Sequence, residues 1–240
     1  MLHRWFGTRR LGFHVVVGPF RPTRIAAAAA ALAGVALIGL IPPVLARGPG
    51  VAAGLAIPFG PSLTAAGWQA VSFPGRSAAR FTARGSDAVH VETAGGAGLL
   101  WRPLPTSAAG ATTATWRWRK ALGVGPTDLS RKGGDDRLLA VYFAFVDPRD
   151  VSGRTDLKAL LRSGRGDILM YVWGGQGRPG TLVNVPYFKG RGRAVVKQPA
   201  DAAAEKWFEE NAALADDFRR AFGRPPGRLV AIALSSDADE

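Results

Sequence analysis

The 240-residue sequence contains no Cys and only three His, three Tyr and two Met. The absence of Cys excludes disulfide bonds, thiolate metal sites and cysteine nucleophiles. Two of the three His, His3 and His14, lie near the N-terminus, so a folded domain without that segment holds only His90. A histidine-cluster metal site is then excluded, and a Ser-His-Asp triad would have to use this one imidazole.

Acidic residues are also scarce, and residues 1–46 contain five Arg and no Asp or Glu. The formal net charge is +13, of which +8 belongs to residues 47–240. There the basic residues are scattered among acidic ones, and no nucleic-acid-binding motif accompanies them, so no specific nucleic-acid interface is expected. An anionic envelope polymer or a membrane surface is an equally suitable partner, with the loop residues Lys189, Arg191 and Arg193 as one contact.

The clearest single feature is an unbroken apolar run from Ile25 to Ile41 that follows Arg21 and Arg24. As a helix the run would be about 26 Å long, which is short for a membrane span of about 30 Å and long for a signal peptide. The small residues at Val44 and Ala46 fit a signal-peptidase site. A cleaved signal peptide and an uncleaved anchor both remain open, and in either case the Arg excess places the following residues outside the cytoplasm.

This pattern divides the chain into three parts. Residues 1–46 are predicted to be a signal peptide or N-terminal membrane anchor, with residues 25–46 holding the chain in the inner membrane if they are not removed. Residues 47–61, rich in Gly, Pro and Ala, are predicted to be a flexible lead. Residues 62–240 are predicted to form one exported domain, periplasmic, secreted or anchored.

From about residue 66, short β-prone runs alternate with Gly and Pro clusters. Short helices are predicted at Asp156–Arg162 and at Asp216–Phe222, the second ending at Gly223. We therefore expect a mainly β fold: an antiparallel β-sandwich, jelly-roll-like, with one or two short helices and preceded by an N-terminal hydrophobic helix. The predicted strands are 68–73, 79–83, 88–93, 98–103, 113–119, 138–146, 167–173, 182–188, 194–197, 207–213 and 228–235.

Two kinds of strand are distinguishable by their side-chain alternation. Trp116-Arg117-Trp118-Arg119 alternates strictly, which predicts both indoles in the core and both guanidiniums outside. The runs 138–146 and 168–173 are apolar on both faces, as in a central strand covered on both sides. Their aromatic residues could instead form a ligand platform, because Tyr and Trp suit a half-wet site, and both interpretations stay open. The platform would consist of Tyr142, Tyr171 and Trp173.

Carboxylates are the remaining candidates for chemistry. Asp135 and Asp136 lie in a Gly-rich turn before one strand, and Asp237 and Asp239 follow the last strand. If they converge, these four residues could hold Ca²⁺, which prefers six to eight hard oxygen ligands. A pair such as Asp135 and Asp136 could alternatively act as acid and base on a glycosidic bond. The third interpretation is structural, because Asp in Gly-rich turns is commonly solvated or caps the turn.

Several of these motifs together resemble a bacterial family of predicted exported proteins, domain of unknown function 3047. The resemblance covers most of residues 60–240 and implies a β-sandwich outside the cytoplasm without an established activity. Similar members continue past the acidic segment into a further strand, whereas this chain ends at Glu240. The motifs that carry the resemblance are Trp116-x-Trp118, Lys132-Gly133-Gly134-Asp135-Asp136, Val141-Tyr142-Phe143-Ala144-Phe145, Leu169-Met170-Tyr171-Val172-Trp173-Gly174, Trp207, Asp217-Phe218, Phe222-Gly223 and Ile232-Ala233 before Ser236-Asp237-Ala238-Asp239.

Three functional hypotheses follow. The first is an exported, non-enzymatic β-sandwich that binds a polar ligand such as an envelope glycan. The second is a carboxylate-dependent enzyme acting on polysaccharide, with Asp135 and Asp136 as the residues to test. The third is a structural envelope protein whose sheet edge near Glu240 pairs with a partner.

Overall fold

The computed structural model describes residues 11–17, 55–150, 159 and 164–238. The predicted hydrophobic helix at 25–41 lies outside these residues, as does most of the helix predicted at 156–162. No helix within the described ranges is long and apolar enough to cross a bilayer. Near the end of the segment predicted as a flexible lead, Ile57 and Phe59 are buried, and Phe59 stacks on Trp68 with ring centroids 4.9 Å apart.

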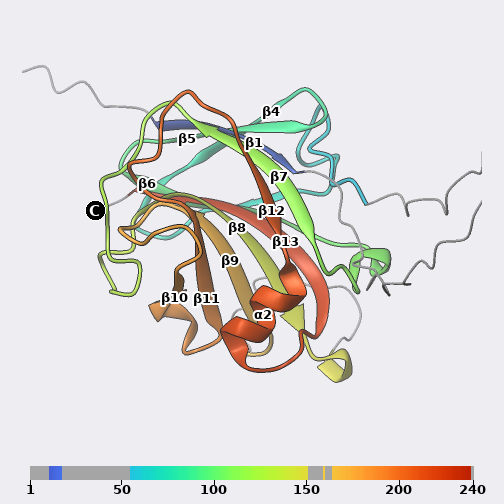
Figure 1. Cartoon of the computed structure of the whole chain (residues 1–240). Coiled ribbons are helices and arrows are strands. Elements are labelled where there is room, and N and C mark those ends of the chain that lie inside the picture. The colour runs from blue at the N-terminus through green and yellow to red at the C-terminus, as the bar shows by residue number, and fades with distance from the viewer. Residues whose placement is uncertain (1–10, 18–54, 151–158, 160–163, 239–240) are drawn as a thin grey trace, which may run out of the picture.

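The strands form two sheets that lie one above the other in Figure 1. The five-stranded sheet has the order β12-β7-β1-β5-β4, and the eight-stranded sheet has the order β10-β11-β9-β8-β13-β6-β2, with β3 paired to β6. Within the described residues, short 3₁₀ helices and the α-helix α2 connect the strands. The elements of the five-stranded sheet are β1 (Leu11–Val17), β4 (Arg80–Arg84), β5 (Ala88–Thr93), β7 (Ala114–Lys120) and β12 (Phe208–Ala212).

The eight-stranded sheet carries most of the long, fully buried strands. Its elements are β2 (Gln69–Val71), β3 (Ser77–Ala78), β6 (Gly96–Pro103), β8 (Arg137–Val146), β9 (Asp167–Trp173), β10 (Leu182–Asn184), β11 (Gly192–Gln198) and β13 (Arg228–Asp237). The connecting helices are η1 (Thr106–Ala108), η2 (Pro148–Asp150), η3 (Pro186–Phe188) and α2 (Leu214–Phe222). Most predicted strands are confirmed, and those at 88–93 and 167–173 have the predicted bounds.

The main core fills the space between the two sheets. Trp116 and Trp118 of β7 point into it and are 3% and 0% exposed, which confirms the prediction from the Trp-Arg alternation. They face aromatic residues of the other sheet. The ring centroids of Trp116 and Tyr171 are 5.3 Å apart, and those of Trp118 and Trp173 are 5.6 Å apart. Burying such large rings contributes strongly to the hydrophobic stabilisation between the layers.

A second apolar layer covers the opposite, outer face of the eight-stranded sheet. Strands β8 and β9 contribute to both layers because successive side chains point to opposite faces. On β9, Leu169, Tyr171 and Trp173 belong to the main core, whereas Met170 and Val172 belong to the outer layer. The prediction that these strands are covered on both sides is therefore confirmed.

The fold was predicted to be an antiparallel β-sandwich, but two of its strand pairs, β9 with β11 and β3 with β6, are parallel. After β9 the chain runs out to the sheet edge as β10 and returns antiparallel to it as β11, which therefore runs parallel to β9. The predicted helix before Gly223 is confirmed as α2. Its Phe218 packs on Phe145 of β8, and Gly223 ends it with a φ of 70°.

Candidate functional site

A cavity of about 350 Å³ lies on the outer face of the eight-stranded sheet. Its floor is made of alanines from three neighbouring strands: Ala97 of β6, Ala144 of β8, and Ala231 and Ala233 of β13. The strand register sets Ala231 directly opposite Ala144. Because each of these side chains is a single methyl group, the sheet surface is hollow where larger residues would fill the space.

Larger apolar and aromatic side chains wall this cavity. Val71 and Phe73 come from the end of β2 and the segment after it, and Phe188 comes from η3. Two aromatic residues of the lining are unusually accessible, since Phe73 is 43% exposed and Tyr187 is 54% exposed. The cavity is therefore open at these two rings, and its volume lies near the lower end of the range of about 300–1,000 Å³ found for small-molecule pockets.

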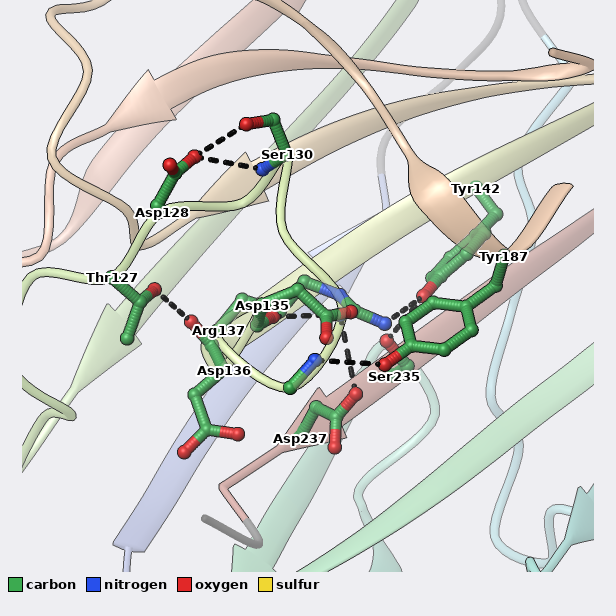
Figure 2. A network of polar contacts seen from close by, with 11 residues as sticks. Thr127, Asp128, Ser130, Asp135, Asp136, Arg137, Tyr142, Tyr187, Ser235 and Asp237 are labelled. Carbon is green, nitrogen blue, oxygen red and sulfur yellow. Dashed lines mark hydrogen bonds and ion pairs between the residues drawn. The ribbon is translucent and has the colours of Figure 1, made fainter. Parts of the chain in front are cut away.

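One end of the cavity is polar and is built around Arg137. Figure 2 shows the polar contacts of this side chain. The Nη1 atom of Arg137 lies 3.2 Å from Oδ2 of Asp135 and 3.2 Å from Oδ2 of Asp237. The Nη2 atom donates a hydrogen bond of 2.8 Å to the hydroxyl of Tyr142, which in turn is 2.8 Å from the Ser235 hydroxyl. We call Asp135, Arg137, Tyr142, Ser235 and Asp237 the polar cluster.

The guanidinium of Arg137 stays charged in this environment. Burial by itself lowers its pKa, but the neighbouring Tyr142, Asp237 and Asp135 outweigh that effect and raise the pKa above its ordinary value. The Nε atom of the same side chain is buried and has no hydrogen-bond partner among the described residues. One cation and two carboxylates thus form a compact, net negative group in which one buried guanidinium donor has no protein acceptor.

Two turns hold the polar cluster in place. The segment before β8 is fixed because the Tyr187 hydroxyl accepts a hydrogen bond of 3.1 Å from the backbone N–H of Gly133. On the other side, Gly174, directly after β9, packs closely against Arg137. A Cβ built on Gly174 would lie 3.1 Å from the Arg137 Cα. Gly174 also has a φ of 147°, so both its backbone conformation and the available space require glycine here.

The structure brings together three of the residues that the sequence singled out, namely Asp135, Asp237 and Tyr142. Asp136 is buried but its side chain points away from Arg137 in Figure 2, and its backbone carbonyl accepts a hydrogen bond from Thr127. Asp239 lies outside the described residues. The side chains of Asp135 and Asp136, the suggested acid–base pair, therefore point in different directions.

Tyr171 and Trp173 do not join Tyr142 in a ligand platform. Both are 0% exposed and lie in the main core, on the opposite face of the sheet from Tyr142. The separation follows from the register, in which Tyr142 is paired with Met170, so that the residues on either side of Met170 face the other way. The hydroxyl of Tyr171 instead donates a hydrogen bond of 2.9 Å to Asp217 of α2.

The geometry does not favour the predicted calcium site. Arg137 lies between Asp135 and Asp237 and occupies the position in which a divalent cation would need these oxygens. Within the described part of the chain, no group of three or more His, Cys, Asp or Glu side chains could hold a metal ion.

Of the basic loop cluster, Arg191 and Arg193 donate to backbone carbonyls of nearby loop residues.

Several residues of the site were missed from the sequence. Arg137 was not singled out, and the floor alanines look like ordinary small core residues. Phe73 follows β2 and Tyr187 lies in η3, and both positions had been predicted as strand residues without a role in a site. The spacing Arg137-x-x-x-x-Tyr142 gives no signal, because an interval of five puts two residues of a regular strand on opposite faces. The register of β8 with β13 shifts between Ser235 and Asp237, beside Arg137, and that irregularity could not be read from the sequence.

A second groove of about 420 Å³ borders the same 127–137 segment and differs in chemistry. Its lining is rich in hydroxyl and amide side chains, contributed by Thr127, Ser130, Gln176, Thr181 and Asn184. A small hollow lined by Leu129, Asp135 and Arg137 lies between the groove and the apolar cavity, because Leu129 also lines the groove and the other two also line the cavity. Groups of this kind suit a hydroxylated ligand.

The fold and the site define a class: a two-sheet, mainly β protein with a ligand-sized apolar cavity that has a charged end. A model for the family described as "protein of unknown function (DUF3047)" matches residues 66–240. The chain belongs to this family, and the resemblance noted from its sequence motifs is confirmed. No curated protein sequence matches the chain.

Proposed function

We propose that this protein is an exported, jelly-roll-like β-sandwich that binds an amphipathic molecule of the cell envelope. The apolar part of the ligand would lie on the alanine floor, and a hydroxyl-bearing head, such as a sugar, would bond to the polar cluster. The observation that carries the proposal is the cavity itself, an apolar hollow of about 350 Å³ that has Arg137 and two carboxylates at one end. Such a combination of apolar lining and few convergent polar groups is typical of small-molecule sites.

The proposed ligand modifies the expectation of a purely polar glycan. A free polysaccharide would leave the methyl groups of Ala144, Ala231 and Ala233 without an apolar partner, whereas an alkyl or acyl chain would cover them. The groove lined by hydroxyl and amide groups supports a sugar as the head, because it borders the same 127–137 segment. A lipid-linked glycan or glycolipid combines both features.

Export is proposed from the sequence alone. It rests on the apolar run from Ile25 to Ile41, the Arg residues before it and the small residues before Arg47. Whether the leader is cleaved or remains as an inner-membrane anchor, the domain would meet envelope lipids and glycans directly.

Catalysis by the carboxylates is less well supported. A glycosidase needs one carboxyl group to hold a proton and a second one to act as base or nucleophile. Here Asp135 and Asp237 are both ion-paired with Arg137, and Asp136 points elsewhere. His90 lies on β5 in the other sheet, 3.5 Å from Glu92. The cluster therefore suits recognition of a head group better than proton transfer.

Octyl glucoside below its micelle concentration is a suitable probe, measured by calorimetry beside glucose alone. We expect saturable binding of octyl glucoside with a negative heat-capacity change and no binding of glucose, because the chain supplies the apolar burial. Ala233→Leu fills the floor and should abolish binding, whereas Ala204→Leu on the exposed surface should leave it unchanged.

The variants also define the result that would contradict the proposal. Equal binding by wild type and Ala233→Leu would place the probe outside the cavity. Absence of binding by wild type to octyl glucoside and to longer alkyl glycosides would remove the amphipathic ligand altogether. Turnover of a polysaccharide that is lost in Asp135→Asn would favour the enzyme hypothesis instead.

A further inference from the structure

The five-stranded sheet is held together by a strand from outside the family-matched region. Strand β1, residues 11–17, lies between β5 and β7 and is antiparallel to both. Among the described strands, it links the β5–β4 half of the sheet to the β7–β12 half. Without it, β5 and β7 would run parallel to each other with one strand's width, about 5 Å, missing between them.

The strands on either side define which sequence fits this slot. At alternate positions the register pairs β1 with Val89 and Val91 of β5 and with Trp116 and Trp118 of β7, all 3% exposed or less. Residues paired across a sheet share a face, so these positions of the inserted strand belong to the core face. The sequence of β1 has apolar residues at those positions: Phe13, Val15 and Val17.

Both predicted fates of the leader separate β1 from this slot. Cleavage after Ala46 would remove residues 11–17, and an uncleaved span over residues 25–41 would leave them on the other side of the membrane from the domain. In either case β5 and β7 would each present an unpaired edge, with the indole of Trp118 on the core side of the gap. Facing unpaired edges readily accept an added strand.

We propose that the slot between β5 and β7 is a strand-binding site for a partner polypeptide. The occupant is an extended segment of about seven residues with apolar side chains at alternate positions, inserted antiparallel to both neighbours. This inference rests on the proposed export and concerns a surface in the other sheet from the ligand cavity. Backbone hydrogen bonds on both sides give the affinity, and the apolar positions give the specificity.

The slot itself is tested in the full-length chain, which contains no Cys. The register pairs His14 with Arg119 on one side and with His90 on the other. Directly paired residues have Cα atoms about 4.5–5.5 Å apart, within the range of a disulfide. We expect the pairs His14→Cys/Arg119→Cys and His14→Cys/His90→Cys to form internal disulfides under mild oxidation, and His14→Cys/Arg149→Cys to remain reduced. Equal disulfide yields for all three pairs, or no disulfide in any of them, would overturn the placement of residues 11–17 between β5 and β7.

The partner is tested with the exported protein purified from the envelope, its N-terminus defined by mass spectrometry. The probe is a fluorescent peptide with the sequence of residues 11–17, and the control peptide has Asp at the positions of Phe13 and Val15. We expect saturable binding of the probe, at least tenfold weaker binding of the control, and a disulfide between Arg119→Cys and a probe carrying Cys at position 14. No binding of the probe would overturn the proposal.

Three further outcomes complete the test, and the last two of them separate this inference from the proposed function. Residues 11–17 retained in the exported protein and cross-linked within the chain would overturn the partner proposal, because the chain then fills its own slot. Octyl glucoside binding without peptide binding would refute the strand site and leave the ligand proposal intact. Peptide binding without octyl glucoside binding would refute the ligand proposal and leave the strand site intact.

Discussion

Removal of the Arg137 guanidinium is expected to destabilise the protein substantially. The side chain is 12% exposed, and its two ion-pair partners, Asp135 and Asp237, are 11% and 23% exposed. Arg137→Met keeps the aliphatic length but leaves both carboxylates without their cation and removes the hydrogen bond that Arg137 donates to Tyr142. Breaking a buried ion pair in this way costs about 3–5 kcal/mol. The lower end, about 3 kcal/mol of unfolding free energy, applies here because water reaches Asp237.

A double variant shows whether the unpaired carboxylates cause the loss of unfolding free energy. Arg137→Met/Asp237→Asn removes one of the two unpaired carboxylates, and we expect it to recover about 1 kcal/mol or more relative to Arg137→Met alone, because groups in direct contact are not additive. Urea unfolding of wild type, both single variants and the double variant gives the full cycle. An unfolding free energy of Arg137→Met within about 0.5 kcal/mol of the wild-type value would refute the account of the polar cluster. Strictly additive losses of unfolding free energy in the double variant would also refute it.

Two further predictions concern the surroundings of the site. Gly174→Ala should lower the unfolding free energy by about 1–3 kcal/mol, because it strains a φ of 147° and meets the Arg137 backbone, while Gly110→Ala, which has open space, should change it little; equal urea midpoints would contradict this. Burial, followed by the effect of Asp217, raises the pKa of Tyr171 above 10, so its contribution to stability is present below pH 10 and is lost as the pH rises above that value. Tyr171→Phe should therefore show a smaller loss of stability between pH 10 and pH 11 than wild type, and the native protein should show no Tyr171 ionisation by absorbance near pH 10; such an ionisation would contradict the burial of the phenol.

The sequence allowed most of the strands to be predicted because period-2 alternation and Gly or Pro boundaries are local signals. Trp116 and Trp118 were assigned to the core correctly, since Arg occupies the other face of β7. Strand β9 offered no such contrast: it is apolar on both faces, so nothing local showed that Tyr171 faces the main core and Met170 the outer layer. The parallel pairing of β9 with β11 depends on a crossover that strand patterns do not encode.

The site could be predicted only in fragments for a similar reason. Asp135 and Tyr142 lie within one segment, but Asp237 joins them through the register of β13, which follows β8 by a long stretch of sequence. The cavity is defined by what is small, Ala144 opposite Ala231, and a short side chain indicates a hollow only when its neighbours are known. Arg137 was overlooked because a basic residue beside a Gly-rich turn is commonly solvated.

The central claim is that an alkyl chain with a hydroxylated head binds on the alanine floor beside Arg137. The most direct measurement is an isotope-filtered NMR experiment with ¹³C-methyl-labelled alanine and octyl glucoside below its micelle concentration. The account predicts intermolecular contacts from the octyl chain to the methyl groups of Ala144, Ala231 and Ala233. Contacts confined to other alanines, or the absence of any contact at saturating probe, would contradict it.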